Sequence, residues 1–123
     1  MIEMDVEKYA PYVAYARQRA AERRRLTAVR HQQAWETARQ IAAFLRDNYQ
    51  PNRIIAFGSL VHPNAFGLHS DLDIAVEGIP WLDYLHACNE VEAKFPLFKV
   101  DLIDMELVSD LVRQRIETEG QAL

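Results

Sequence analysis

Three aspartates in apolar surroundings are the residues of this sequence best suited to chemistry. Asp71 and Asp73 open an apolar run that ends at Val76, and Asp101 stands in a later run, 100–103. Because alternate side chains of a strand point to the same face, Asp71 and Asp73 are expected to project side by side. Neighbouring carboxylates repel each other, and burial increases the repulsion. The pattern therefore predicts a cation here, and Mg²⁺ fits best because it takes oxygen ligands and shares them with substrate phosphates.

A Gly-Ser pair ends an earlier apolar run, which extends from Arg53 to Phe57 and is typical of a buried strand. Glycine lets the backbone approach a ligand closely. A small hydroxyl residue at the start of a helical turn offers N–H and O–H donors to a phosphate. We therefore expect Gly58 and Ser59 to bind phosphate groups beside the aspartates.

Several common catalytic motifs are absent from the sequence, which narrows the chemistry. It contains no G-x-x-x-x-G-K-[ST], G-x-G-x-x-G or H-E-x-x-H pattern, and no G-x-S-x-G elbow. A Gly-Ser turn with three aspartates on apolar strands suits phosphoryl or nucleotidyl transfer, in which two cations clamp the attacking and leaving oxygens. The opposing interpretation, three unrelated surface aspartates, leaves unexplained why all three lie in apolar runs.

The first 50 residues are predicted to be helical, because they are rich in Ala, Arg, Glu and Gln and contain no Gly. Pro11 suits a first helical turn, so the helix is expected to start near it. Whether one helix or two follow, with a break near Leu26-Thr27, is left open by the sequence. The later part carries apolar residues at helical spacing, which should pack on a sheet: Ala34, Ala38, Ile41 and Leu45, widened by Trp35 and Phe44.

The rest of the chain alternates between expected strands and helices. Strands are predicted at 53–57, 71–76 and 98–103, and a helix at 81–95 with an apolar face formed by Leu82, Leu85, Cys88, Val91 and Phe95. Cys88 is interpreted as a small core residue rather than a nucleophile. A last helix is expected to end at Gly120, with one face formed by Leu107, Val108, Leu111, Val112 and Ile116. These elements predict an α/β fold, a small mixed sheet of three or four strands flanked by helices, with the site at one sheet edge.

Length and composition indicate one compact domain of 123 residues. We divide it into a helical N-terminal extension, residues 1–50, and a core, residues 51–123. A single cysteine excludes an internal disulfide, and no signal peptide or membrane-spanning run is seen. A cytoplasmic location is therefore expected, with no membrane partner.

Charge is distributed unevenly along the chain. Residues 1–50 carry 9 Lys/Arg and 6 Asp/Glu, whereas residues 51–123 carry 5 and 12. Six arginines crowd one segment of the N-terminal half that has only Glu22 as an opposite charge: Arg17, Arg19, Arg23, Arg24, Arg25 and Arg30. This segment is either a solvated helix surface or a contact for an acidic protein face or for RNA. The acidic balance of the whole chain and the lack of interleaved aromatics favour a protein contact, so direct nucleic-acid binding is not expected.

The motifs together resemble the DNA polymerase β-type nucleotidyltransferase superfamily. The resemblance rests on Gly58-Ser59, on Ser70-Asp71-Leu72-Asp73-Ile74-Ala75-Val76 and on Val100-Asp101-Leu102-Ile103. The small size, and the final residues 116–123, resemble its minimal nucleotidyltransferase (MNT) branch, the antitoxins of HEPN-domain toxins. The resemblance covers roughly Ile54 to Leu123 and implies a polymerase β-like nucleotidyltransferase fold.

The resemblance also implies roles for the motif residues. Gly58 and Ser59 would hold the triphosphate of ATP, and Asp71 and Asp73 would coordinate two Mg²⁺ ions. Asp101 would complete the site of one ion and help activate the incoming hydroxyl. The implied reaction is transfer of AMP to a tyrosine of a cognate HEPN ribonuclease toxin, which silences it within a two-gene toxin–antitoxin module. Two alternatives remain: an antitoxin that acts by direct binding, and a small-molecule nucleotidyltransferase, for which the chain leaves little room.

The sequence departs from this branch after the Gly-Ser pair, where an arginine is frequent and Leu60 stands instead. A cation that neutralises the phosphates then comes from elsewhere, and Arg53 and Lys99 are the candidates. His62 and His69 lie in the connection that follows, and we interpret them as loop residues, without the spacing of a zinc site.

Overall fold

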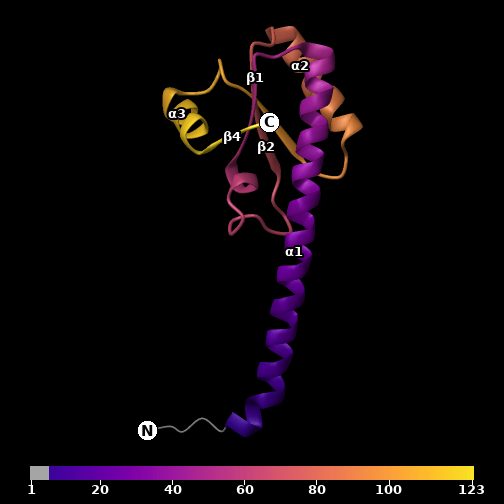
Figure 1. Ribbon diagram of the computed structural model, residues 1–123, viewed down its shortest axis with the longest axis vertical. Helices are drawn as coiled ribbons and strands as arrows, with labels where there is room; N and C mark the ends of the chain where they lie inside the picture. Colours follow the sequence, from indigo (N-terminus) through magenta and orange to yellow (C-terminus); the bar gives the residue numbers. More distant parts are fainter. Residues whose placement is uncertain (1–5) are drawn as a thin grey trace.

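The structure is a computed structural model that describes residues 6–123, and helices and strands alternate along it (Figure 1). The elements in chain order are α1 (Val6–Tyr49), β1 (Arg53–Phe57), the 3₁₀-helix η1 (Gly58–Val61), β2 (Leu72–Glu77), α2 (Trp81–Lys94), β3 (Val100–Asp104), α3 (Asp110–Glu119) and β4 (Gln121–Ala122). None of the described helices is long and apolar enough to cross a membrane.

The four strands form one mixed sheet in the order β3-β2-β1-β4. Strand β1 pairs antiparallel with both β2 and β4, whereas β2 and β3 are parallel and are connected through α2. The predicted small mixed sheet flanked by helices is therefore confirmed. The short β4 was not foreseen as a strand, although Gly120 does cap α3 as expected.

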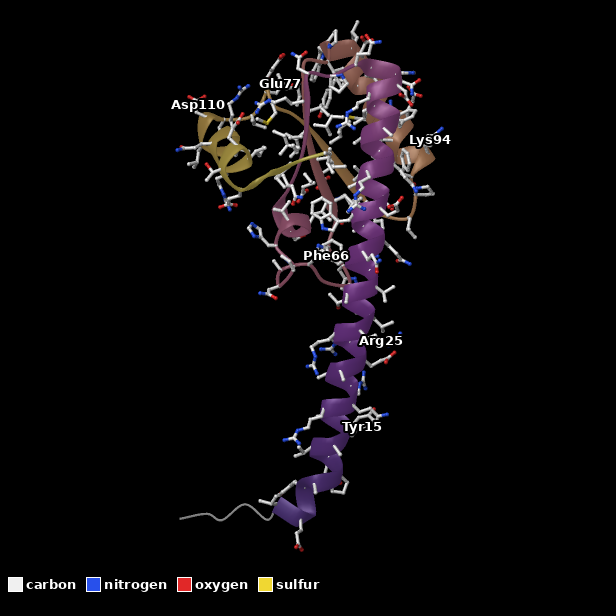
Figure 2. The ribbon with its side chains drawn as sticks, in the orientation of Figure 1. Tyr15, Arg25, Phe66, Glu77, Lys94 and Asp110 are labelled. Atoms are coloured by element: carbon white, nitrogen blue, oxygen red, sulfur yellow. The ribbon has the colours of Figure 1, made fainter. Side chains whose placement is uncertain are left out.

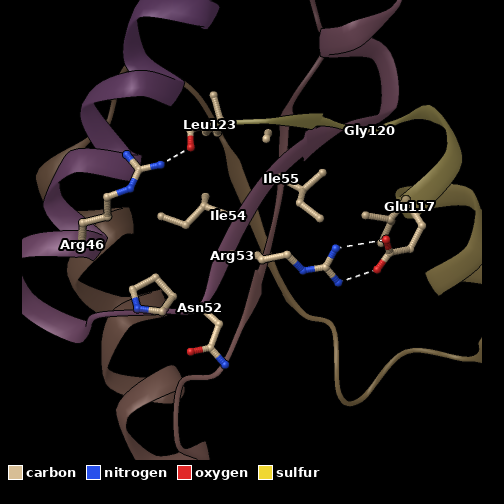
Figure 3. Close-up of a pocket in the computed structure, with 11 residues that line it drawn as sticks. Arg46, Asn52, Arg53, Ile54, Ile55, Glu117, Gly120 and Leu123 are labelled. Carbon is tan, nitrogen blue, oxygen red and sulfur yellow. Dashed lines mark hydrogen bonds and ion pairs between the residues drawn. The ribbon is translucent and has the colours of Figure 1, made fainter.

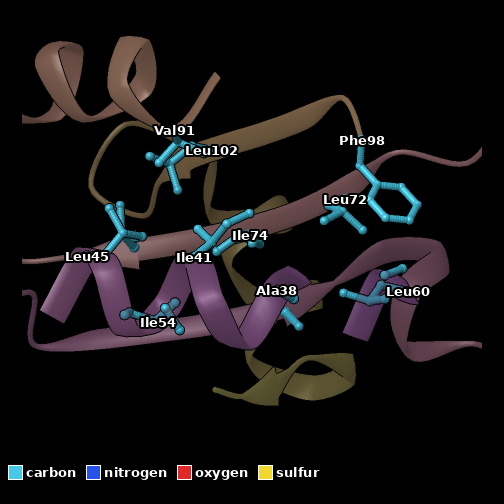
Figure 4. Packing of buried hydrophobic residues seen from close by; sticks show 14 of the residues in the cluster. Ala38, Ile41, Leu45, Ile54, Leu60, Leu72, Ile74, Val91, Phe98 and Leu102 are labelled. Atoms are coloured by element: carbon cyan, nitrogen blue, oxygen red, sulfur yellow. The ribbon is translucent and has the colours of Figure 1, made fainter. Parts of the chain in front are cut away.

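The main core lies between one face of the sheet and the helices α1 and α2 (Figure 4). The predicted face of α1 is confirmed, because Ala34, Ala38, Ile41 and Leu45 are all 0% exposed. Trp35 and Phe44 pack partly buried against the same cluster. A smaller cluster on the opposite face of the sheet joins Ile55, Ala75, Met105 and Ile116, so α3 covers only part of that face.

Helix α1 runs unbroken for 44 residues, about 66 Å, and the buried residues of this helix all lie in its second half, between Ala34 and Leu45. Residues 6–29, which we call the arm, are exposed or partly exposed throughout and project away from the sheet (Figure 1). The prediction that the helix starts near Pro11 is wrong, because Pro11 lies inside it. The proline removes the N–H that would bond to the carbonyl of Glu7, but this turn is exposed and water can satisfy the carbonyl.

The predicted apolar faces of the last two helices are wrong in part. Leu82 and Leu85 of α2 are 76% and 43% exposed, whereas Ala87 and Val91 are buried. The predicted Cys88 and Phe95 do pack, partly buried, against the main core. A spacing of three residues falls about 60° short of a full turn at each step, so Leu82 and Val91 lie on opposite sides of the helix.

In α3 only Ile116 is buried, and Leu111 is 71% exposed. Leu107 and Val108 precede the helix because Ser109 caps it, accepting a hydrogen bond from the N–H of Val112 at 3.3 Å. The predicted face therefore began one turn too early.

Candidate active site

The sheet places two of the three predicted aspartates side by side on neighbouring strands. In the parallel pair, Asp73 on β2 is the register partner of Asp101 on β3, and the charge of Asp101 acts on the Asp73 carboxyl group. Asp71 precedes β2 by one residue and projects on the same side. Leu72 between them is fully buried in the main core, so the alternation inferred from the sequence is what the structure shows.

Burial raises the pKa of Asp73 to about 6. The negative charge of Asp101, the hydrogen bond between the two carboxyl groups and the charge of Asp71 raise this pKa further, while Lys99 opposes them. The Nζ of Lys99 lies 3.9 Å from Oδ2 of Asp71, and the lysine side chain is largely exposed. Three carboxylates therefore lie close together. Among the described residues, the only cation within ion-pair distance of them is the exposed Lys99.

The turn after β1 closes over this carboxyl cluster. Gly58 has a φ of +69°, and a Cβ at this position would lie 2.3 Å from Oδ2 of Asp73. Any side chain would therefore collide with the carboxylate, so the backbone of the turn can approach it only because residue 58 is glycine. Ser59 follows in the 3₁₀-helix η1, partly buried, directly after Gly58.

Two residues of α1 bind the segments that carry the site. Neither of them was assigned to the site from the sequence. The Nη2 of Arg30 donates to the carbonyl oxygen of Ser70 at 3.2 Å, directly before Asp71. The Nε2 of His31 lies 2.7 Å from the carbonyl oxygen of Leu60 and donates to it, because a carbonyl can only accept. Arg30 was grouped with the basic segment, and nothing local in the sequence distinguishes it or His31.

Arg53 and Lys99, the two candidates for a cation that neutralises the phosphates, lie at different places relative to the carboxyl cluster. Arg53 stands at the far end of β1 from Gly58 and pairs with Glu77 at 2.9 Å and with Glu117. Figure 3 shows the ion pair of Arg53 with Glu117 in a hollow at that end of the sheet, beside a hydrogen bond from Arg46 to the Leu123 carbonyl. Arg53 is thus excluded as a phosphate ligand, whereas Lys99 lies beside the carboxylates.

Two hollows flank the carboxyl cluster on opposite sides. The larger, about 590 Å³, lies on the β3 side and is lined by Glu92, Pro96, Phe98, Lys99, Val100 and Asp101. The smaller, about 190 Å³, lies between the end of β1 and α3 and is lined by Phe57, Gly58, Val112, Arg115, Ile116 and Glu119. A molecule lying across the sheet from one hollow to the other passes over Asp73.

The residues at this edge have the chemistry that Mg²⁺ requires. Among residues 6–123, no three His, Cys, Asp or Glu side chains are arranged to enclose a metal ion by themselves. Mg²⁺ does not need such a cage, because it binds through one or two carboxylates and takes its remaining ligands from water and substrate phosphates. The raised pKa of Asp73 indicates carboxyl groups without enough positive charge around them, and Gly58 leaves room beside Oδ2. The oxygen donors of Asp71, Asp73 and Asp101 therefore fit the ion.

Cys88 does not take part in this site. It is half-buried in α2 and packs against the main core, and burial raises the pKa of its thiol. A raised pKa disfavours the thiolate, which is the reactive form.

Comparison with known proteins adds independent information. A family model described as Polymerase beta, Nucleotidyltransferase matches residues 39–123, so the match begins inside α1 rather than at Ile54. No curated protein sequence matches the chain.

Three solved structures are similar to this chain. One is a toxin–antitoxin complex with AMP-PNP, at 26% identity and a TM-score of 0.58, covering 69% of this chain and 70% of that chain. Another is a tri-AMPylated Shewanella oneidensis HEPN toxin in complex with an MNT antitoxin, at 24% identity and a TM-score of 0.55, covering 72% and 70%. A third, described as a minimal nucleotidyltransferase, has 19% identity and a TM-score of 0.62, covering 76% of this chain and 95% of that chain.

Proposed function

This chain belongs to the polymerase beta nucleotidyltransferase family, and we propose that it is an antitoxin that transfers AMP from ATP to a tyrosine of a HEPN-domain toxin. The likeness to a toxin–antitoxin complex with AMP-PNP supports ATP as the substrate. The likeness to an MNT antitoxin bound to a tri-AMPylated HEPN toxin supports a protein acceptor.

The observation that carries the proposal is one row of residues across the sheet. Phe57 at the end of β1 is the register partner of Asp73, and Asp73 is the register partner of Asp101. Gly58 follows Phe57 with its backbone against the Asp73 carboxylate. Phosphate-binding backbone, metal-binding oxygens and a carboxylate able to accept a proton therefore stand side by side.

The reaction follows from this order. The tyrosine hydroxyl oxygen forms a bond to the α-phosphorus of ATP, while the bond from that phosphorus to the bridging oxygen breaks and its electron pair leaves with pyrophosphate. Asp101 accepts the hydroxyl proton, since it lies at the edge of the larger hollow, where an acceptor side chain can enter. The backbone at Gly58 and Ser59 holds the phosphates on the other side.

Asp71, Asp73 and Asp101 would hold Mg²⁺ through their carboxylate oxygens. When bound, Mg²⁺ supplies positive charge that polarises the α-phosphate and stabilises the leaving pyrophosphate. Asp73 must be ionised to bind the ion, so the proposal requires the cation to overcome the burial and repulsion that raise its pKa.

The direct test is transfer of label from α-labelled ATP, with Mg²⁺, to the protein encoded by the adjacent gene. We expect label on that protein with the wild type, and none with Asp73→Asn or Asp101→Asn. Asp47→Asn is the matched control, because it makes the same substitution at an exposed residue of α1, at the opposite end of the sheet. Transfer retained in Asp73→Asn would overturn the assignment of the site.

The arm favours a second candidate function, neutralisation of the toxin by direct binding. It carries six basic and two acidic residues, and its exposed apolar side chains include Tyr12 and Tyr15, which are 69% and 59% exposed. Figure 2 shows Tyr15 on the part of α1 that projects away from the sheet. The side chain of Tyr15 accepts a hydrogen bond from Arg19 at 3.1 Å. A basic helix with exposed tyrosines that does not pack on its own sheet suits the acidic surface of a protein partner.

Toxin assays separate the two candidates. If AMP transfer neutralises the toxin, the double variant Asp71→Asn, Asp73→Asn leaves the toxin's ribonuclease activity intact at concentrations where wild type with ATP abolishes it. If binding alone neutralises it, the double variant protects as well as the wild type, and ATP makes no difference.

A further inference from the structure

The turn that is proposed to hold the triphosphate lacks a basic residue of its own. Leu60, the residue after Gly58-Ser59, is 0% exposed and packs in the main core (Figure 4). An ATP molecule carries several negative charges that one turn of backbone N–H groups does not balance. A basic residue from another element would add to the positive charge that Mg²⁺ is proposed to supply there.

Residues 39–123, which match the family, contain seven lysines and arginines. Six of them interact with other groups of the protein: Arg39 with Glu36, Arg46 with the Leu123 carbonyl, Arg53 with Glu77 and Glu117, Lys94 with the ring of Phe44, Lys99 with Asp71, and Arg113 with Glu77 and the Met105 carbonyl. Arg115 is the one basic residue of this segment, all of which the structure describes, that makes no such interaction.

Arg115 also lies where the missing charge is needed. It stands on the same face of α3 as Val112 and Glu119, three and four residues away. This face lines the smaller hollow opposite Phe57 and Gly58. The hollow, about 190 Å³, is below the roughly 300 Å³ of a pocket that encloses a whole small ligand, so it suits one end of a ligand.

We propose that Arg115 binds the β- and γ-phosphates of the nucleotide and replaces the basic residue that is absent at Leu60. This inference rests on the proposed function, and it specifies on which side of the site pyrophosphate leaves. The groups then form one row across the sheet, from α3 to β3, in the order Arg115, Gly58, Asp73 and Asp101. Pyrophosphate leaves toward α3 while the acceptor hydroxyl enters from the larger hollow beside β3, which is the geometry of an in-line displacement.

The smaller hollow is also lined by the carboxylate of Glu119, which would repel phosphates if it pointed at them. The Oε2 of Glu119 lies 3.6 Å from Nε2 of His62. Both side chains are about half exposed, so Glu119 can turn toward His62 and solvent when phosphates occupy the hollow. Arg115 forms no ion pair with Glu119, although the two are four residues apart on one helix, so its guanidinium remains available.

The test is binding of AMP-PNP and of AMP, each with Mg²⁺, measured by calorimetry. We expect Arg115→Ala to weaken AMP-PNP binding by about tenfold to a hundredfold, the usual effect of losing charge-assisted hydrogen bonds. Binding of AMP, which has no β- or γ-phosphate, should be unchanged. Arg115→Lys should restore part of the affinity for AMP-PNP, and Arg39→Ala, another exposed arginine, is the matched control.

The outcomes separate this inference from the proposed function. Unchanged AMP-PNP affinity in Arg115→Ala, in a protein whose wild type binds AMP-PNP, overturns the role of Arg115 and leaves the proposed function standing. An equal loss for AMP and AMP-PNP also overturns it, because Arg115 would then contact the nucleoside or α-phosphate end. A wild type that binds no AMP-PNP overturns both.

Discussion

The carboxylate of Asp73 occupies the space into which a side chain of residue 58 would project, so Gly58 and Asp73 form one unit although they lie on different elements. A Cβ on residue 58 would be 2.3 Å from Oδ2 of Asp73, and the positive φ of Gly58 adds backbone strain to any substitution. The turn that is proposed to bind phosphate and the carboxylate that is proposed to bind Mg²⁺ therefore constrain each other's position.

Gly58→Ala should abolish AMP transfer, because the new methyl group displaces the Asp73 carboxylate. Gly78→Ala is a matched control: its φ is +89°, and its Cβ would lie 2.6 Å from Nδ2 of Asn52, away from the carboxyl cluster. Both variants should lose about 1–2 kcal/mol of stability from the left-handed backbone, as measured by urea unfolding. Full transfer activity in Gly58→Ala would contradict the unit described above.

Asp73 should make the stability of the metal-free protein fall between about pH 4 and pH 6. Its folded pKa, about 6, is higher than its ordinary value of 3.8, so the folded state binds the proton more tightly than the unfolded state. The stabilisation is present below the ordinary pKa and is lost as the pH rises through the folded pKa. Asp73 is only half-buried, so we expect about 1 kcal/mol after allowance for solvent screening.

Thermal melts in EDTA across this pH range measure the effect. Wild type should lose stability with rising pH relative to Asp73→Asn, and Mg²⁺ at neutral pH should raise the Tm of the wild type but not of the variant. Asp47→Asn should behave as the wild type. Parallel pH profiles for wild type and Asp73→Asn would show that ionisation of Asp73 does not destabilise the folded protein.

His31→Ala should lower the rate of AMP transfer several-fold, because His31 holds the carbonyl of Leu60 and through it the turn at Gly58. The loss of stability should be about 1 kcal/mol, the usual value for one hydrogen bond. His31→Gln, which keeps a donor, should recover part of the rate. A variant with normal stability and an unchanged rate would show that the turn holds its position without α1.

Charge reversal on the arm should weaken the complex with the toxin without changing the Tm of the free protein. Arg23→Glu with Arg24→Glu alters two exposed residues, so the fold does not depend on them. We expect at least a tenfold weaker Kd, measured by calorimetry, and Arg39→Glu is the control on the packed half of α1. An unchanged Kd would assign the contact to another surface.

The sequence was sufficient for the strands and for the carboxyl cluster, because both depend on local patterns. Apolar runs located β1, β2 and β3, and two-residue alternation placed Asp71 and Asp73 on one face of β2. The register between β2 and β3, which pairs Asp73 with Asp101, could not be read from the chain but was implied by the family motifs.

The features that the sequence missed depend on contacts between distant segments. Arg30 and His31 reach loops 40 and 29 residues away, and no local pattern separates them from the solvated side chains of the arm. The two-residue β4 exists because β1 offers it an open edge. Among the lysines and arginines of residues 39–123, Arg115 differs only in lacking a partner, and this can be seen only from the positions of all their side chains.

The intact mass of the toxin after incubation with this protein, ATP and Mg²⁺ tests the central claim most directly. The account predicts a mass increase of one or more AMP units, located on tyrosine by fragmentation, with wild type and Asp47→Asn, and no increase with Asp73→Asn. A toxin of unchanged mass that is nevertheless silenced in a complex with the wild type would contradict catalysis and leave binding through the arm as the mode of neutralisation.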